Sequence, residues 1–155
     1  MSKQTITQKT SDNQYYHKDF HIALNFGIDY LHRNFGEEAV RAYLTQFASV
    51  YYSPLIEAIS EKGLLAIKEH YENIYEIEKA VFDMSFLQDK LIIQLSASPA
   101  VVHIKANGHT VSELFHETVS TVNKIICRNT PYDFELLEYN NSNGAYRLRF
   151  FRRDE

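Results

Sequence analysis

Histidine, glutamate and tyrosine side chains gather in residues 64–79, and these residue types can move protons near neutral pH. His70 lies between Ile67 and Ile74 on the side that helical periodicity turns inward, and Glu78 lies eight residues later. A histidine held by a tyrosine or a carboxylate can act as a general base. His70 and Glu78 are therefore the candidate catalytic residues. A partly buried histidine satisfied by a backbone carbonyl or a tyrosine hydroxyl would give the same pattern.

Aromatic residues are numerous, with 11 tyrosines and 10 phenylalanines. Tyr71 and Tyr75 lie in the same segment as His70, and aromatic rings with polar tips often line small-molecule pockets. These two tyrosines are candidate ligand-binding residues. Aromatic side chains also fill protein cores, which is the alternative interpretation.

A short helix is predicted to begin at Ser98, because proline is favoured at the first helical position and Pro99 follows. Free backbone N–H groups at such a helix start can hold an anion. Ser98 is expected to cap the helix rather than to act as a nucleophile, because its oxygen satisfies those amides. Ser98 and His103 are further candidate ligand-binding residues. The pocket is expected where residues 64–79 meet this helix start.

Two histidines, His17 and His21, are spaced to face the same direction on a helix, and Asn25, Asp29 and His32 continue close to that stripe. Such a set suits zinc or ferrous iron, but a solvated polar face beside the apolar stripe is the favoured interpretation, and no metal site is assigned. Glycine-rich phosphate loops, Gly-x-Ser-x-Gly elbows and paired cysteines are absent from the sequence. No cofactor is expected.

The elements that would position these residues follow from hydrophobic periodicity and from turn signals. In residues 111–127, Ser112, His116 and Asn123 fall opposite Phe115 and Val119 and are expected to face solvent. Helices are predicted from residues 11 or 12 to 35, from 37 to 51 with an interruption at Ser53-Pro54 and a continuation to 60, over 64–79, from Ser98 to Gly108, and over 111–127; strands are predicted over 80–86, 91–96, 134–139 and 145–151.

This order of elements predicts an α+β fold, in which N-terminal helices pack on a small, mostly antiparallel sheet built from two hairpins separated by helices. Residues 13–155 are expected to form a single domain, and residues 1–12 a disordered tail. The arginines of residues 147–153 are expected to guard an edge strand. Apolar residues outside the cleanest stripes, such as Phe26, Phe47 and Tyr52, indicate a homodimer interface in the helical half.

The charge and composition of the chain narrow the classes of partner that it is expected to bind. The net charge is −4 and the pI about 6.0, whereas binding to nucleic acid or to an anionic membrane surface requires a basic patch. The sequence also lacks an apolar run long enough to span a membrane. Cys127 is the only cysteine, so no intramolecular disulfide can form. The expected location is cytoplasmic, and the expected partner is a small molecule rather than nucleic acid or membrane.

Four stretches carry a resemblance to a known family: residues 21–24 (HIAL), 75–78 (YEIE), 98–101 (SPAV) and 144–152 (GAYRLRFFR). Over residues 16–152 the chain resembles the L-2-amino-thiazoline-4-carboxylic acid hydrolases and, more distantly, vinyl-reductase-type small-ligand domains. Members of that family often carry a cysteine before the proline and another in the final strand, where this chain has Ser98 and Leu148. The resemblance implies a cytosolic fold with an internal pocket and ring-opening C–N hydrolysis.

Three functions are compatible with these patterns. The first is a small-molecule hydrolase that acts on a cyclic C–N bond. The second is a non-catalytic sensor or carrier of a small apolar or aromatic ligand. The third is a dimeric interaction protein without a ligand. Converging His, Tyr and Glu side chains would favour the enzyme, an apolar pocket the sensor, and a filled interior the interaction protein.

Overall fold

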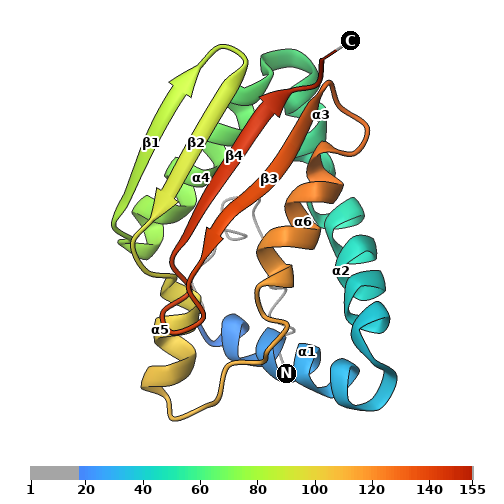
Figure 1. Cartoon of the computed structure of the whole chain (residues 1–155), viewed down its shortest axis with the longest axis vertical. Coiled ribbons are helices and arrows are strands. Elements are labelled where there is room, and N and C mark those ends of the chain that lie inside the picture. The colour runs from blue at the N-terminus through green and yellow to red at the C-terminus, as the bar shows by residue number, and fades with distance from the viewer. Residues whose placement is uncertain (1–17, 155) are drawn as a thin grey trace, which may run out of the picture.

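Six helices and four strands make up residues 18–154, which is the part of the chain that this computed structural model describes (Figure 1). The predicted tail, the predicted helix start near residue 11 and His17 lie outside the described residues. The elements in chain order are α1 (Asp19–Phe35), α2 (Glu37–Tyr51), α3 (Ser53–Lys62), α4 (Leu64–Glu78), β1 (Phe82–Leu87), β2 (Lys90–Leu95), α5 (Pro99–Ala106), α6 (Glu117–Cys127), β3 (Tyr132–Tyr139) and β4 (Tyr146–Arg152).

The four strands form one antiparallel sheet in the order β1-β2-β4-β3. Each hairpin pairs consecutive strands, and the two hairpins join where β2 lies against β4, with Leu95 opposite Tyr146 and Leu91 opposite Phe150. This arrangement confirms the predicted α+β class with a sheet built from two hairpins. The predicted strand limits differ from the observed ones by one or two residues.

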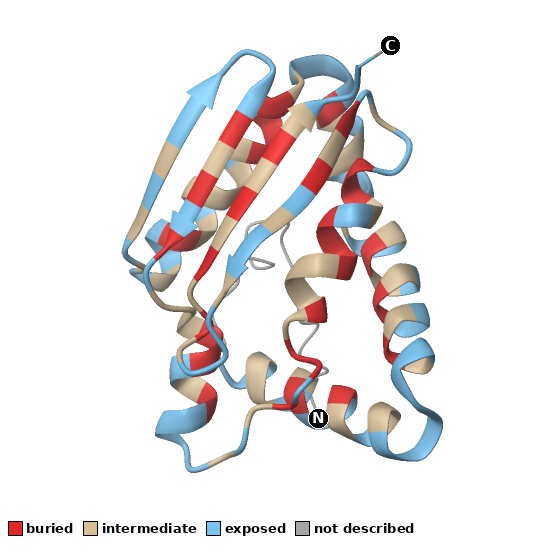
Figure 2. Ribbon diagram, viewed as in Figure 1, coloured by how far each residue is buried: buried red, intermediate tan, exposed pale blue. Residues whose placement is uncertain are grey.

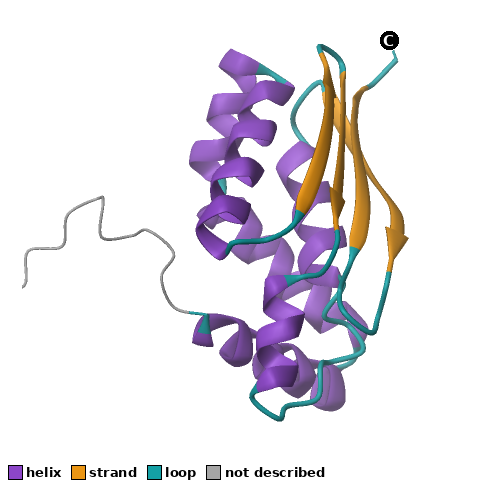
Figure 3. Ribbon diagram, turned by 90° about the vertical axis from the view of Figure 1, so that its left-hand side faces the viewer, coloured by secondary structure: helices purple, strands orange, loops and turns teal. Residues whose placement is uncertain are grey.

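One face of the sheet carries the core. Residues Leu91, Ile93 and Leu95 of β2 are buried, as are Leu148 and Phe150 of β4, and each alternates with more exposed neighbours (Figure 2). The helices that pack on the sheet lie on this side of it, while α1 and α5 lie beyond one end of the strands (Figure 1 and Figure 3). Helix α4 contacts β2 and α6 contacts β3, while α1 and α5 contact each other at one end of the molecule.

No described helix packs on the other face of the sheet (Figure 3), and several charged residues lie on it. Arg149 of β4 bonds to Glu135 of β3, and Arg147 lies 3.7 Å from Glu138. The Arg149 guanidinium also lies 4.8 Å from the centre of the Phe151 ring. The prediction that these arginines guard an edge strand is wrong, because β4 lies between β2 and β3. They keep the open face of a central strand polar instead.

Helix α6 is shorter than predicted, because it begins at Glu117 and not at residue 111. The buried amide of Asn25 explains the difference: its Nδ2 donates to the Thr110 carbonyl at 2.9 Å, and its Oδ1 accepts from the Ser112 N–H at 2.8 Å. These bonds hold residues 110–112 outside the helix and compete with helical bonding. The expectation of a solvent-facing side is wrong for Ser112 and Asn123, which are both buried.

Candidate functional site

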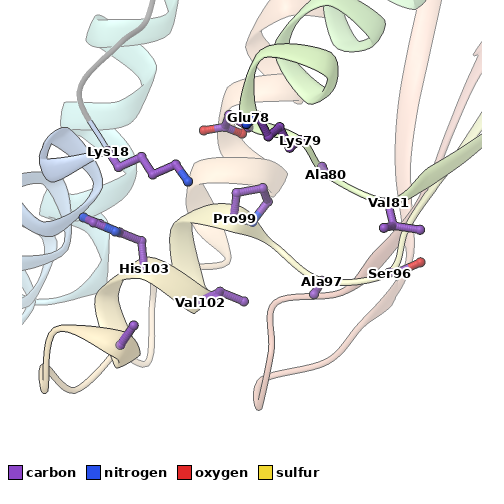
Figure 4. Close-up of a pocket in the computed structure, with 11 residues that line it drawn as sticks. Lys18, Glu78, Lys79, Ala80, Val81, Ser96, Ala97, Pro99, Val102 and His103 are labelled. Atoms are coloured by element: carbon purple, nitrogen blue, oxygen red, sulfur yellow. The ribbon is translucent and has the colours of Figure 1, made fainter.

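A cleft of about 370 Å³ lies between the end of α4, the start of α5 and the segment that leads into β1 (Figure 4). Its walls come from parts of the chain that are distant in sequence. The residues that line it are Lys18, Glu78, Lys79, Ala80, Val81, Ser96, Ala97, Pro99, Val102, His103 and Ala106.

The wall from α4 follows from the way this helix ends. Lys79 adopts a left-handed conformation with φ +56°, and the Ala80 N–H returns to the Tyr75 carbonyl at 2.8 Å. Such a C-terminal cap stops the helix and turns the chain sharply. Ala80 and Val81 therefore run along the cleft before β1 begins.

The wall from α5 begins as the sequence predicts. Ser98 caps the helix, with its Oγ accepting from the Val101 N–H at 3.4 Å, and Pro99 occupies the first turn. The Ser98 N–H donates to the Asn143 carbonyl at 2.9 Å, which ties this helix start to the β3–β4 hairpin. Because the Ser98 hydroxyl is engaged with the backbone, Ser98 has the role of a cap.

Two histidine–carboxylate pairs attach α1 to the walls of the cleft. His21 Nε2 lies 2.9 Å from Glu78 Oε1, with only 15% and 8% of these side chains exposed. His103 Nε2 lies 3.1 Å from Asp19 Oδ1 near the cleft opening. Glu78 therefore has a titratable partner at a position where it also lines the cleft.

Two lysines add positive charge to the cleft. The Lys18 side chain reaches from the start of α1 toward Pro99, and Lys79 lies beside Glu78 (Figure 4). No carboxylate among the described residues forms an ion pair with either ammonium group. An anion that enters the cleft would meet two cations that form no ion pair with a carboxylate of residues 18–154.

The predicted site residues divide between this cleft and the core. Glu78 and His103 both line the cleft, and Ser98 caps the helix that forms one of its walls. His70, Tyr71 and Tyr75 do not line it. The structure therefore brings Glu78 to the predicted junction of α4 with the start of α5, but it does not bring His70 there.

His70 lies in an aromatic environment instead. Its ring meets the Tyr52 ring edge-on at 5.7 Å and the Tyr71 ring at 5.4 Å. Burial disfavours the charged imidazolium and lowers the pKa of His70 to about 4. His70 is therefore neutral at pH 7, and a base with this pKa is far weaker than one tuned to neutral pH.

Tyr71 and Tyr75 form hydrogen bonds inside the core. The Tyr71 hydroxyl donates to Asn123 Oδ1 at 2.7 Å, and the Tyr75 hydroxyl bonds to that of Tyr146. Burial is the largest cause that raises the pKa of Tyr71, Tyr75 and Tyr146. These tyrosines remain protonated at neutral pH and join α4 to α6 and to β4.

Lys18 and Lys79 were missed by sequence reasoning, and so was the pairing of His21 with Glu78. A lysine at the end of an amphipathic helix is typical of a solvated position, so nothing local marks Lys79 as part of a cleft. Tertiary contacts between α1 and α4 create the arrangement. Within residues 18–154, no group of three histidine, cysteine, aspartate or glutamate side chains is placed to hold a metal ion.

Comparison with known proteins adds no assignment: no family model matches the chain, and no curated protein sequence matches it significantly. Among the helices of residues 18–154, none combines the length and apolar character that crossing a membrane requires.

Proposed function

We propose that this protein binds a small organic acid in the cleft between α4 and α5. The observation that carries the proposal is the pair of lysines, Lys18 and Lys79, which line the cleft without a carboxylate partner among the described residues. A carboxylate or phosphate group of the ligand would neutralise these charges, and lysine is well suited to bind such groups as a point charge.

The rest of the lining supports a ligand with an apolar body. Val81 and Val102 are 71% and 50% exposed, and Pro99 lies between the lysine side chains and this apolar wall. Covering these side chains removes apolar surface from water and contributes roughly 25 cal/mol per Å². A compact amphiphilic acid satisfies both parts of the lining, whereas a purely apolar ligand would leave the lysines without a counter-ion.

Binding can be tested by titrating the full chain with aromatic and aliphatic carboxylates and with their neutral amides, using NMR chemical shifts. We expect carboxylates to shift the signals of α5 and of residues 79–81, and the amides to bind at least tenfold more weakly. Lys18→Gln and Lys79→Gln should each weaken binding, while Lys124→Gln, an exposed lysine of α6, should not. Equal binding of acids and amides, or equal effects of all three variants, would contradict the proposal.

A second candidate function is hydrolysis of a cyclic C–N bond, and the His21–Glu78 pair favours it. Glu78 lines the cleft with its carboxylate bonded to an imidazole at 2.9 Å, so a water molecule in the cleft can lose a proton to this pair as its oxygen bonds to the ring carbon. The pair can return that proton to the ring nitrogen as the C–N bond breaks. Ser98 is engaged as a helix cap, and Cys127 is fully buried. Direct attack of water is therefore the route that this arrangement supports.

A measurement of turnover distinguishes the two candidate functions, ligand binding and hydrolysis. Glu78→Gln keeps the shape of the side chain and removes the base. If the protein is an enzyme, cyclic amidine carboxylates should be opened by the wild-type chain at a rate that this variant loses, while binding of the same compounds remains. Binding without turnover in the wild-type chain would assign the cleft to a sensor or carrier.

A further inference from the structure

The two edges of the sheet are protected unequally. Strand β3 forms one edge and β1 the other. An unprotected edge presents a row of free N–H and C=O groups, which can pair with a further strand. The difference between the two edges points to a binding surface along β1.

The edge formed by β3 is blocked by side chains of its own chain. The Tyr132 N–H donates to Thr130 Oγ1 at 3.2 Å, and the Phe134 N–H donates to Asp133 Oδ1 at 2.8 Å. The pairing of β3 with β4 also shifts register between Leu136 and Glu138, which interrupts the regular spacing. A strand approaching this edge would find the N–H groups of Tyr132 and Phe134 already occupied.

The edge formed by β1 lacks such protection. The Ser96 N–H donates to the Val81 carbonyl at 3.0 Å, so the backbone N–H and C=O groups of Val81 point toward β2. Because this direction alternates along a strand, Phe82, Met84 and Phe86 direct their N–H and C=O groups away from the sheet. Within residues 18–154, no side chain hydrogen-bonds to any of these groups.

We propose that two copies of this chain pair through β1, antiparallel, with the two-fold axis at Met84 of each copy. Met84 then lies opposite Met84 of the partner subunit, and Phe82 lies opposite Phe86 of the partner subunit. Every residue whose backbone points outward thus meets another such residue, so each pair exchanges two hydrogen bonds. Because each copy has a sheet of four strands, the two sheets become one continuous sheet of eight strands.

The side chains fit this register. Asp83 lies opposite Ser85 of the partner subunit, so no like charges face each other. Val81 lies opposite Leu87 of the partner subunit, and these are the most exposed apolar side chains of this region, at 71% and 65%. Moving the register by two residues in one direction would place Asp83 opposite Asp83 of the partner subunit, which is unfavourable. Moving the register by two residues in the other direction would place Phe82 opposite Gln88 of the partner subunit, in the turn after β1.

The pairing also reaches the cleft. Val81 lines the cleft and is the residue that Leu87 of the partner subunit would face. Each copy would therefore contribute an apolar side chain beside the binding site of the other. Occupation of the cleft and dimer formation would then favour each other.

Sedimentation of the full chain over a series of concentrations tests the pairing. We expect a reversible dimer, and Ser85→Asp should raise its dissociation constant at least tenfold, because it places a carboxylate opposite Asp83 of the partner subunit. Adding Asp83→Lys to Ser85→Asp should restore dimerisation, since opposite charges then face each other. Thermal unfolding verifies that each variant is folded.

A matched control substitution tests the helical face, where the sequence predicts a dimer interface. Val50 of α2 is 73% exposed beside the stacked rings of Phe47 and Tyr51, and Val50→Asp should leave the β1 dimer unchanged. A wild-type chain that stays monomeric at all concentrations would overturn the proposal. Dissociation by Val50→Asp but not by Ser85→Asp, or failure of the charge reversal to restore the dimer, would also overturn it.

Discussion

The Tyr71 hydroxyl donates to Asn123 Oδ1 at 2.7 Å, and this bond joins α4 to α6 beneath the sheet. The Asn123 side chain also donates to the Val119 carbonyl at 2.9 Å, and only 1% of the residue is exposed. A buried amide needs partners for both its oxygen and its nitrogen, because desolvation without hydrogen bonds is costly. Tyr71 therefore contributes to the packing of the two helices that contact the sheet.

Tyr71→Phe should lower the free energy of unfolding by about 1–3 kcal/mol, because it leaves the buried oxygen of Asn123 without its donor. Asn123→Leu should also destabilise the protein. The double variant should lose less stability than the sum of the losses of the two single variants, since no unpaired oxygen remains. Urea denaturation of the four proteins measures the coupling. Additive losses would mean that the hydrogen bond contributes nothing to stability.

Gly144→Ala should destabilise the protein and disturb α5. The glycine has φ +70°, and an added Cβ would lie 2.6 Å from Ser98 Cβ and from Val101 Cγ2. Both the strained backbone and the clash act at the helix start that forms one wall of the cleft. Thermal unfolding and amide chemical shifts of α5 measure these effects.

Gly27→Ala is the matched control, because this residue lies inside α1 and, apart from its chain neighbours and the helix's own backbone, no atom lies within 4 Å of the added Cβ. Alanine is a better helix former than glycine, so this variant should gain about 0.5–1 kcal/mol of stability. Similar effects of the two substitutions would show that the contact of Gly144 with α5 is unimportant.

Local patterns predicted most of the fold. Pro99 after Ser98 marked the start of α5, and the turn signals between the predicted strands marked the two hairpins of the sheet. The start of α6 was missed, because it depends on Asn25, which is 87 residues from Ser112 along the chain. The cleft was located only in part for the same reason: the His21–Glu78 pair spans 57 residues.

Cys127 should resist thiol reagents in the folded protein. Its side chain is fully buried, and burial raises the pKa of the thiol to about 12, so the reactive thiolate is scarce at pH 8. We expect labelling by iodoacetamide to be at least a hundredfold slower in buffer than in denaturant. Mass spectrometry follows the reaction. Comparable rates in the two conditions would mean that α6 opens readily around this residue.

Acid should destabilise this protein partly through His70. Burial lowers its pKa to about 4 in the folded state, whereas an unfolded histidine titrates near 6.5. The unfolded chain therefore binds the extra proton first as the pH falls, so the contribution of His70 to stability is complete above pH 6.5 and is lost between pH 6.5 and 4. The loss amounts to about 3 kcal/mol by linkage.

His70→Phe keeps an aromatic ring between Tyr52 and Tyr71 but cannot titrate. The free energy of unfolding, measured from pH 7 to pH 4, should therefore fall less steeply in the variant, because both proteins share every other titrating group. A constant difference between the two across this range would mean that His70 keeps an ordinary pKa in the folded state.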